Sequence, residues 1–212
     1  MEVIIENQLL VLLAEKAIYW PELKTLIIAD LHFGKVTHFN KSGINLPVET
    51  IIQELKKLTI LIERFKPDAI IFLGDFFHHK SNYELSYFES WRKSYLQTEF
   101  ILVIGNHDKH ALKELKQLNF KLIMELLCPP FLFAHAPEKT SKQFRIVGHI
   151  HPGVKLLGKA NQQLILPAFC LTEKQLLLPA FGNFTGLKVY KPEINERIFV
   201  VTGTKVVEVR NT

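Results

Sequence analysis

Apolar runs that alternate with polar turns and helical patterns organise the first half of the chain. The run 69–73, AIIFL, contains no polar residue, which is typical of a strand buried on both faces of a sheet. Comparable runs occupy 23–29, 100–104, 131–134 and 145–147. From Ile51 to Phe65, apolar residues recur at helical spacing, and Pro67 ends that helix. Strands that alternate with helices in this way predict an α/β fold.

The remaining segments add further strands and an aromatic helix. Residues 8–13 and 17–20 predict a strand pair at a sheet edge. From residue 121 onward, proline and glycine interrupt short apolar runs, and LILPAFC at 164–170 is echoed by LLLPAFG twelve residues later. We interpret the echo as two strands with similar kinks, so the second half is predicted to be mainly β. Aromatic residues at helical spacing in 83–95 predict a helix with an aromatic core face.

Side chains that can bind a metal ion follow the apolar runs. Asp75, preceded by Gly74, comes directly after the run 69–73. One such aspartate is explained by an ordinary Gly-Asp turn, but several strands that end in the same way are not. Because the carboxyl ends of parallel strands meet at one edge of a sheet, these side chains are expected to converge. The full set is Asp30, His32, Asp75, Asn106, His107, Asp108, His135, His149 and His151.

Oxygen and nitrogen ligands without a thiolate suit Mn, Fe, Zn, Ni or Co rather than a structural zinc. Two ions that share a ligand account for this number of donors better than a single ion does. Such ions lie about 3.5–4 Å apart and repel each other, so a carboxylate must lie between them, and Asp75 is the natural candidate. In an extended segment side chains two apart point the same way, so Asp30 with His32, and His149 with His151, can each serve one centre. The remaining positive charge would attract an anion such as a phosphodiester.

Asp108 also has a purely structural interpretation. Residues 109–118 carry leucines at helical spacing, and an aspartate in front of such a pattern is a good helix cap. A cap accounts for Asp108 and Gly105, but it does not require Asn106 and His107 between them.

A polar loop, 33–47, follows the first predicted ligands. Its cations Lys35, His38 and Lys41 are close to the site in sequence and are candidates for contact with a phosphate. Solvated loop charges are an equal alternative for Lys35 and the favoured interpretation for His38 and Lys41. His78 is a further substrate candidate because it follows Asp75 closely.

Composition limits the interpretation only mildly. The 212 residues fit one domain, 1–212, and are enough to bury a stable core. A formal net charge of +5 favours anionic partners without reaching the density of a nucleic-acid-coating protein. Cys128 and Cys170 have no CxxC spacing, and no segment reaches the roughly 18 apolar residues of a membrane span. We therefore expect a soluble cytoplasmic protein that has no membrane partner.

The motifs and their order resemble those of the calcineurin-like metallophosphoesterases. They are DLH at 30–32, GD at 74–75, GNHD at 105–108, AH at 134–135 and GHIH at 148–151. The resemblance implies that one metal is held by Asp30, His32, Asp75 and His151, and the other by Asp75, Asn106, His135 and His149. It further implies that His107 contacts the phosphoryl group and acts as general acid, with Asp108 orienting it.

Two positions depart from the family pattern. His78 replaces the last residue of the frequent GDxxD motif, and Ala134 replaces the glycine that usually precedes the histidine of the fourth motif. Neither change removes a ligand, but the first one leaves open what supports the GNH segment.

A narrower resemblance covers nearly the whole chain. LLAEKAIYWPELKTLIIADLHFGK, GINLP, GDFFH, GHIHPGV and LLPAFGNFTG are similar to segments of the bacterial DNA ligase-associated metallophosphoesterases. This resemblance implies a four-layer αββα sandwich of two mixed β-sheets with helices outside. It also implies a role in DNA repair beside an ATP-dependent DNA ligase, a helicase and a nuclease, while leaving the substrate open.

These observations predict a phosphodiesterase with two divalent ions, Mn²⁺ first among them, that acts on nucleic-acid ends or nucleotide diesters. A metal-bridging hydroxide would attack phosphorus in line, with no covalent enzyme intermediate. Substrate contacts are expected from Asn106, His107, Lys35 and His78. One alternative is a hydrolase of a small cytosolic phosphate compound, either a cyclic nucleotide or a phosphomonoester, and the net charge does not separate the two. A non-catalytic docking scaffold is a third reading, but such a site should have lost Asp75 or His107.

Overall fold

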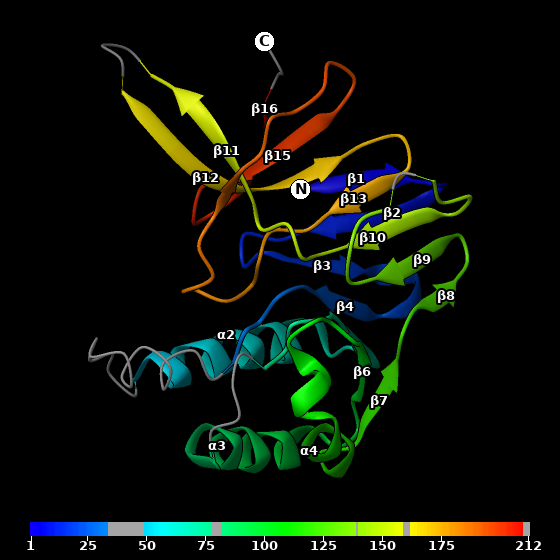
Figure 1. The fold of residues 1–212 in the computed structure, drawn as a ribbon, viewed down its shortest axis with the longest axis vertical. Helices are drawn as coiled ribbons and strands as arrows, with labels where there is room; N and C mark the ends of the chain where they lie inside the picture. Colours follow the sequence, from blue (N-terminus) through cyan, green and yellow to red (C-terminus); the bar gives the residue numbers. More distant parts are fainter. Residues whose placement is uncertain (34–48, 78–81, 139, 159–161, 210–212) are drawn as a thin grey trace.

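The computed structural model describes residues 1–33, 49–77, 82–138, 140–158 and 162–209. Two mixed β-sheets pack face to face, and helices cover the outer face of the first sheet (Figure 1). The predicted α/β sandwich of two mixed sheets with flanking helices is confirmed, and among the described residues the α-helices lie on the first sheet. None of the described helices is long and apolar enough to cross a membrane.

The first sheet has the strand order β1-β2-β3-β4-β5-β6-β7. Its strands are Glu2–Ile5, Gln8–Leu12, Ala17–Trp20, Thr25–Ile28, Ala69–Leu73, Glu99–Val103 and Phe120–Ile123. Neighbours from β1 to β4 are antiparallel, and those from β4 to β7 are parallel. The covering helices are α2 (Glu49–Phe65), α3 (Asn82–Arg92) and α4 (Leu112–Gln117), with short 3-10 turns at Pro21–Leu23, Lys93–Tyr95 and Asp108–His110.

The second sheet is built from the β-rich second half of the chain, as predicted. Its strands β8 to β16 are Leu126–Cys128, Phe131–Ala134, Phe144–Val147, Pro152–Leu157, Gln163–Leu171, Gln175–Leu177, Lys188–Val189, Arg197–Val201 and Val206–Val209. The strands β9, β10 and β13 run parallel side by side, and β12 pairs antiparallel with β11, β13 and β15. The echo of LILPAFC is therefore only partly a second strand, because β13 ends at Leu177 and the following residues leave the sheet.

Alternation along the central strands divides the core into layers. In β5, Ile70 and Phe72 belong to the cluster under the helices, whereas Ile71 and Leu73 belong to the cluster between the sheets. A third apolar cluster lies on the opposite face of the second sheet. The fully apolar run 69–73 is thus explained by burial on both of its faces.

Five strands carry the predicted ligands, and they come from both sheets. The strands β4, β5 and β6 are parallel neighbours in the first sheet, and β9 and β10 are parallel neighbours in the second. The strand ends that follow the apolar runs therefore meet where the two sheets face each other, rather than along the edge of one sheet.

Substituting Phe72 with alanine should strongly destabilise this core. The Phe72 ring is 1% exposed and contacts the rings of Phe76, Phe100 and Phe120, with centroids 4.9–5.8 Å away. We expect Phe72→Ala to lower the free energy of unfolding by about 3–5 kcal/mol, measured by urea denaturation of metal-free protein. The control Ile60→Ala removes a side chain that is 56% exposed and should change it by less than about 0.5 kcal/mol. Equal effects of the two substitutions would contradict this account.

Candidate metal centre

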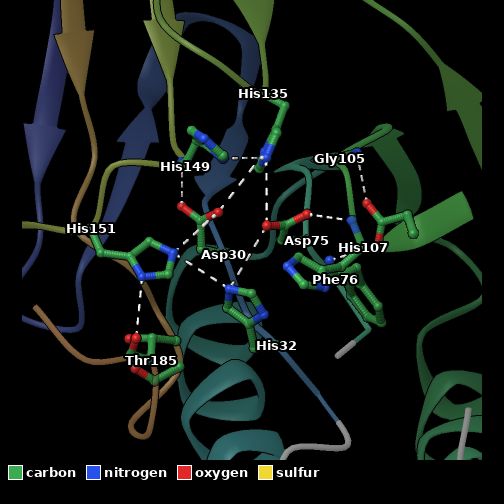
Figure 2. A network of polar contacts seen from close by, with 12 residues as sticks. Asp30, His32, Asp75, Phe76, Gly105, His107, His135, His149, His151 and Thr185 are labelled. Atoms are coloured by element: carbon green, nitrogen blue, oxygen red, sulfur yellow. Dashed lines mark hydrogen bonds and ion pairs between the residues drawn. The ribbon is translucent and has the colours of Figure 1, made fainter. Parts of the chain in front are cut away.

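The predicted ligands reach the site from turns at the carboxyl ends of the strands. Asp30 and Asp75 each come two residues after their strand, β4 and β5. His135 directly follows β9, and His149 lies two residues beyond β10. The residues 105–108 form the turn after β6. Segments that are distant in sequence are thereby brought together, as the sequence predicted (Figure 2).

The first cluster consists of Asp30, His32 and His151, whose ligand atoms all lie within 4.8 Å of one another. The Nε2 atoms of His32 and His151 are 3.4 Å apart, and Nε2 of His151 lies 3.5 Å from Oδ1 of Asp30 (Figure 2). Nδ1 of His151 faces the carbonyl oxygen of Thr185 at 3.4 Å. Since a carbonyl only accepts hydrogen bonds, Nδ1 carries the proton and the lone pair of Nε2 faces the cluster.

The second cluster consists of Asp75, His135 and His149. Nε2 of His135 lies 3.0 Å from Nδ1 of His149 and 3.5 Å from Oδ2 of Asp75. The Nδ1–H of His135 donates to the carbonyl oxygen of Leu73 at 2.9 Å, which again leaves Nε2 to face the cluster. Desolvation lowers the pKa of His149, and the neighbouring His135 lowers it further. The lowered pKa of His149 favours the neutral form that a metal ligand requires.

Asp75, a member of the second cluster, also lies close to the first. Its Oδ2 is 3.5 Å from Nε2 of His135 in the second cluster and 3.9 Å from Nε2 of His32 in the first. Its Oδ1 accepts a hydrogen bond of 2.9 Å from the backbone N–H of His107. The carboxylate is 3% exposed and has the position that a bridging ligand needs.

The ligand residues adopt an unusual backbone conformation. The φ angles of Asp30, His32, Asp75, His149 and His151 are 51°, 49°, 48°, 69° and 51°. This left-handed region costs a non-glycine residue about 1–2 kcal/mol, and such strain is often found at functional sites. The segments are therefore not extended. The prediction that His149 and His151 serve one centre was wrong, because they lie in different clusters, although this division agrees with the family resemblance.

The glycines of the motifs make room for ligand side chains from other segments. A Cβ atom on Gly105 would lie 2.3 Å from the backbone nitrogen of Asp75 and 2.5 Å from its Oδ1. A Cβ atom on Gly148 would lie 2.5 Å from Oδ2 of Asp30. These two positions need glycine because a carboxylate occupies the space of a side chain.

Asp108 joins the GDFF and GNHD turns. Its Oδ1 accepts hydrogen bonds from the backbone N–H groups of Phe76 at 2.8 Å and Phe77 at 3.3 Å, and its Oδ2 accepts one from Gly105 at 2.8 Å. Asp108 is not the cap of the following helix, which begins after Ala111. The sequence left open what supports the GNH segment when His78 replaces the last aspartate of GDxxD. In the structure, Asp108 provides that support. Its predicted orientation of His107 stays a prediction.

Asn106 and His107 are exposed in the turn after β6, and the His107 ring lies 5.6 Å from the ring of His32, centre to centre. Their roles as ligand, general acid and substrate contacts remain predictions. The substrate candidates Lys35, His38, Lys41 and His78 lie outside the described residues. Sequence reasoning missed Thr185 as a partner of His151, although the stretch LLPAFGNFTG that contains it was noted.

The donors at this site fit divalent cations. Oδ1 of Asp30 is buried without a hydrogen-bond partner, which is costly unless another positive group satisfies it. Two carboxylates and four imidazoles match the preferences of Mn, Fe, Zn, Ni and Co. Either cluster offers three donors to one ion, and Asp75 lies within reach of both.

This fold and this paired Asp/His site define a metallophosphoesterase. The calcineurin-like phosphoesterase family matches residues 23–160, which include both clusters, and the chain belongs to that family. Among solved structures it is similar to the nuclease MPE of Pseudomonas putida, with 30% identity, 99% of each chain covered and a TM-score of 0.85. It is also similar to Yfce, a phosphoesterase from E. coli, at 10% identity over 87% of this chain and 97% of that one, with a TM-score of 0.45. No curated protein matches.

A methyl group at Gly148 should selectively weaken metal binding. Because it would displace the Asp30 carboxylate, we expect Gly148→Ala to weaken Mn²⁺ binding by about 10-fold or more, measured by isothermal titration calorimetry. At Gly158 the nearest atom to an added Cβ is 3.4 Å away, so Gly158→Ala serves as the control and should bind Mn²⁺ like the wild type. Unchanged affinity in Gly148→Ala would rule out Asp30 as a ligand.

Replacing Asp108 with asparagine should lower stability in a pH-dependent way. Burial raises the pKa of Asp108, and the charge of Asp75 adds to this, while the three N–H donors oppose it. Between pH 3.8 and that raised pKa the folded protein binds more protons than the unfolded chain, so this group's contribution to the free energy of unfolding falls as pH rises. We expect Asp108→Asn to cost about 1–3 kcal/mol at low pH, and less as pH rises. A cost that grows with pH, in urea denaturation of both proteins, would contradict this expectation.

Proposed function

We propose that this phosphoesterase is a two-metal phosphodiesterase that acts on nucleic-acid or nucleotide diesters. The observation that carries the proposal is that Oδ2 of Asp75, in the second cluster, faces Nε2 of His135 in that cluster and Nε2 of His32 in the first cluster. One divalent ion would be held by the first cluster and the other by the second cluster with Asn106, and Asp75 would be shared between them. Ions at these positions would supply Lewis acidity that activates water and neutralises charge on the phosphoryl oxygens.

The residues around the clusters set the polarity of the site. Asp30 and Asp75 are 1% and 3% exposed, so their charges act on a bound ion with little screening by water. Two divalent cations outweigh two carboxylates, and the site then favours an anionic group. A phosphodiester, with a single negative charge, is one such group.

His107 is the proposed general acid. Its backbone is fixed by the hydrogen bond to Asp75, while its side chain is exposed beside the first cluster. A histidine at the open side of the site can reach the leaving oxygen and transfer a proton to it. Proton transfer matters most for a poor leaving group such as the alkoxide of a sugar.

The nucleic-acid part of the proposal is supported by the similarity to the Pseudomonas putida nuclease MPE along almost the whole chain. The resemblance to the DNA ligase-associated metallophosphoesterases supports a role in DNA repair with an ATP-dependent DNA ligase, a helicase and a nuclease as partners. Mn²⁺ is the ion to test first.

The proposal predicts metal-dependent hydrolysis of a diester. We expect metal-stripped protein reloaded with Mn²⁺ to hydrolyse bis(p-nitrophenyl) phosphate faster than p-nitrophenyl phosphate. Asp75→Asn should abolish hydrolysis of both because it removes the shared ligand. His107→Ala should reduce cleavage of a single-stranded oligonucleotide by about 10²–10⁴-fold, but reduce hydrolysis of the nitrophenyl diester far less, because nitrophenolate leaves without protonation.

His110→Ala is the matched control for His107→Ala, since His110 is an exposed histidine three residues away in the same turn region. It should keep the activity of the wild type on each substrate. A preference for the monoester would instead favour hydrolysis of a small phosphate compound. Hydrolysis that does not depend on added metal would overturn the proposal.

A further inference from the structure

The segment 181–185 packs against the first cluster. The backbone N–H of Phe181 donates to the carbonyl oxygen of Ala29 at 2.8 Å, and that of Gly182 donates to the carbonyl oxygen of Asp30 at 3.3 Å. The segment is thus hydrogen-bonded to Asp30, the first predicted ligand, and to the residue before it, Ala29. This stretch had no assigned role in the predicted chemistry.

The contact with the motif DLH leaves no space for a side chain. A Cβ atom on Gly182 would lie 2.4 Å from the carbonyl oxygen of Leu31, between the two ligands of that motif. At its other end the segment presents the Thr185 carbonyl oxygen to Nδ1 of His151 (Figure 2). The same five residues therefore contact both chain segments that form the first cluster, and they select the tautomer of one of its histidines.

Two lysines hold this segment from the opposite side. Nζ of Lys57, on α2, donates to the carbonyl oxygen of Phe181 at 3.1 Å and lies 3.7 Å from the centre of its ring. Nζ of Lys16, in the turn between β2 and β3, donates to the carbonyl oxygen of Gly182 at 3.0 Å. Two consecutive carbonyl groups are thus bound by side chains from two distant elements.

A glutamate on the same helix completes the arrangement. Oε1 of Glu54 accepts a hydrogen bond of 3.2 Å from the backbone N–H of Asn183, and Glu54 is 7% exposed. Three consecutive residues of the segment are therefore bound by ionisable side chains. We call these side chains, Lys16, Glu54 and Lys57, the brace.

Burial of the brace costs desolvation free energy. Burial lowers the pKa of Lys57 to about 6, and the nearby Lys16 lowers it further against the opposing effect of Glu54 and Glu15. Burial likewise lowers the pKa of Lys16 to about 8, against the effect of Glu54. Apolar residues would fill this space at lower cost, which suggests that the hydrogen bonds to the segment serve a purpose other than stability.

We propose that the brace positions the first cluster by holding residues 181–185 against the DLH motif and His151. The inference rests on the proposed two-ion function. The hydrogen bonds of the segment with the site run to residues 29, 30 and 151, which form or adjoin the first cluster. The second cluster has its own support at His135, through the Leu73 carbonyl, and it is linked to the first cluster by the 2.8 Å hydrogen bond from the backbone N–H of His149 to Oδ2 of Asp30. Loss of the brace should therefore affect one ion much more than the other.

The test is a Mn²⁺ titration of Lys57→Met, which keeps the length of the side chain and removes its donor. Calorimetry in a His149→Ala background reports the first cluster, and calorimetry in a His32→Ala background reports the second. We expect Lys57→Met to weaken binding about 10-fold at the first cluster and less than about 2-fold at the second. Lys57→Arg, which restores a donor, should recover part of the loss.

Lys56→Met is the matched control, because Lys56 is the exposed neighbour of Lys57 on the same helix, and it should bind Mn²⁺ like the wild type. If Lys57→Met does not fold, Lys16→Met tests the same segment from its other bound carbonyl. Equal losses of affinity at both clusters, or no loss at either, would overturn the inference. The proposed function would still stand in that case if the wild-type protein binds two ions. A wild-type protein that binds no Mn²⁺ would instead overturn the proposed function.

Discussion

The arrangement of the site depends on the contacts of the Asp75 carboxylate. One of its oxygens faces a histidine from each cluster, and the other is fixed by the backbone N–H of His107. The first sheet supplies Asp75 and His32, while the second supplies His135. The two sheets must therefore keep their separation for Asp75 to serve both clusters. The apolar core between them, which contains Leu73 and Ala29, consequently fixes the site as well as the fold.

The site stores strain that the core has to balance. Five ligand residues adopt positive φ angles, and each costs about 1–2 kcal/mol. These turns persist because the strands before them are buried on both faces and cannot shift to relieve the strain. The sharp turns bring metal-type side chains that follow β4 and β5 in the first sheet close to those that follow β9 and β10 in the second.

The sequence pattern predicted the strands and the metal-type residues because both are local properties. Buried strands are fully apolar runs, and ligands follow them directly, so β5 and Asp75 were readable together. The conformation of the turns was not, which is why His149 and His151 were assigned to one centre. A helix cap was the structural alternative for Asp108, because its partners Phe76 and Phe77 are about thirty residues away in sequence. Only the fold brings such partners together.

The buried polar groups around the site bind backbone rather than ligand side chains. Asp108 accepts from three N–H groups, and Lys57 and Lys16 donate to two carbonyl groups. Support through the backbone fixes the direction of a turn whatever side chain it carries. It also makes the position of a ligand independent of the residue next to it. The GNH turn is held in this way by Asp108, so its support does not require the last aspartate of the GDxxD motif at position 78.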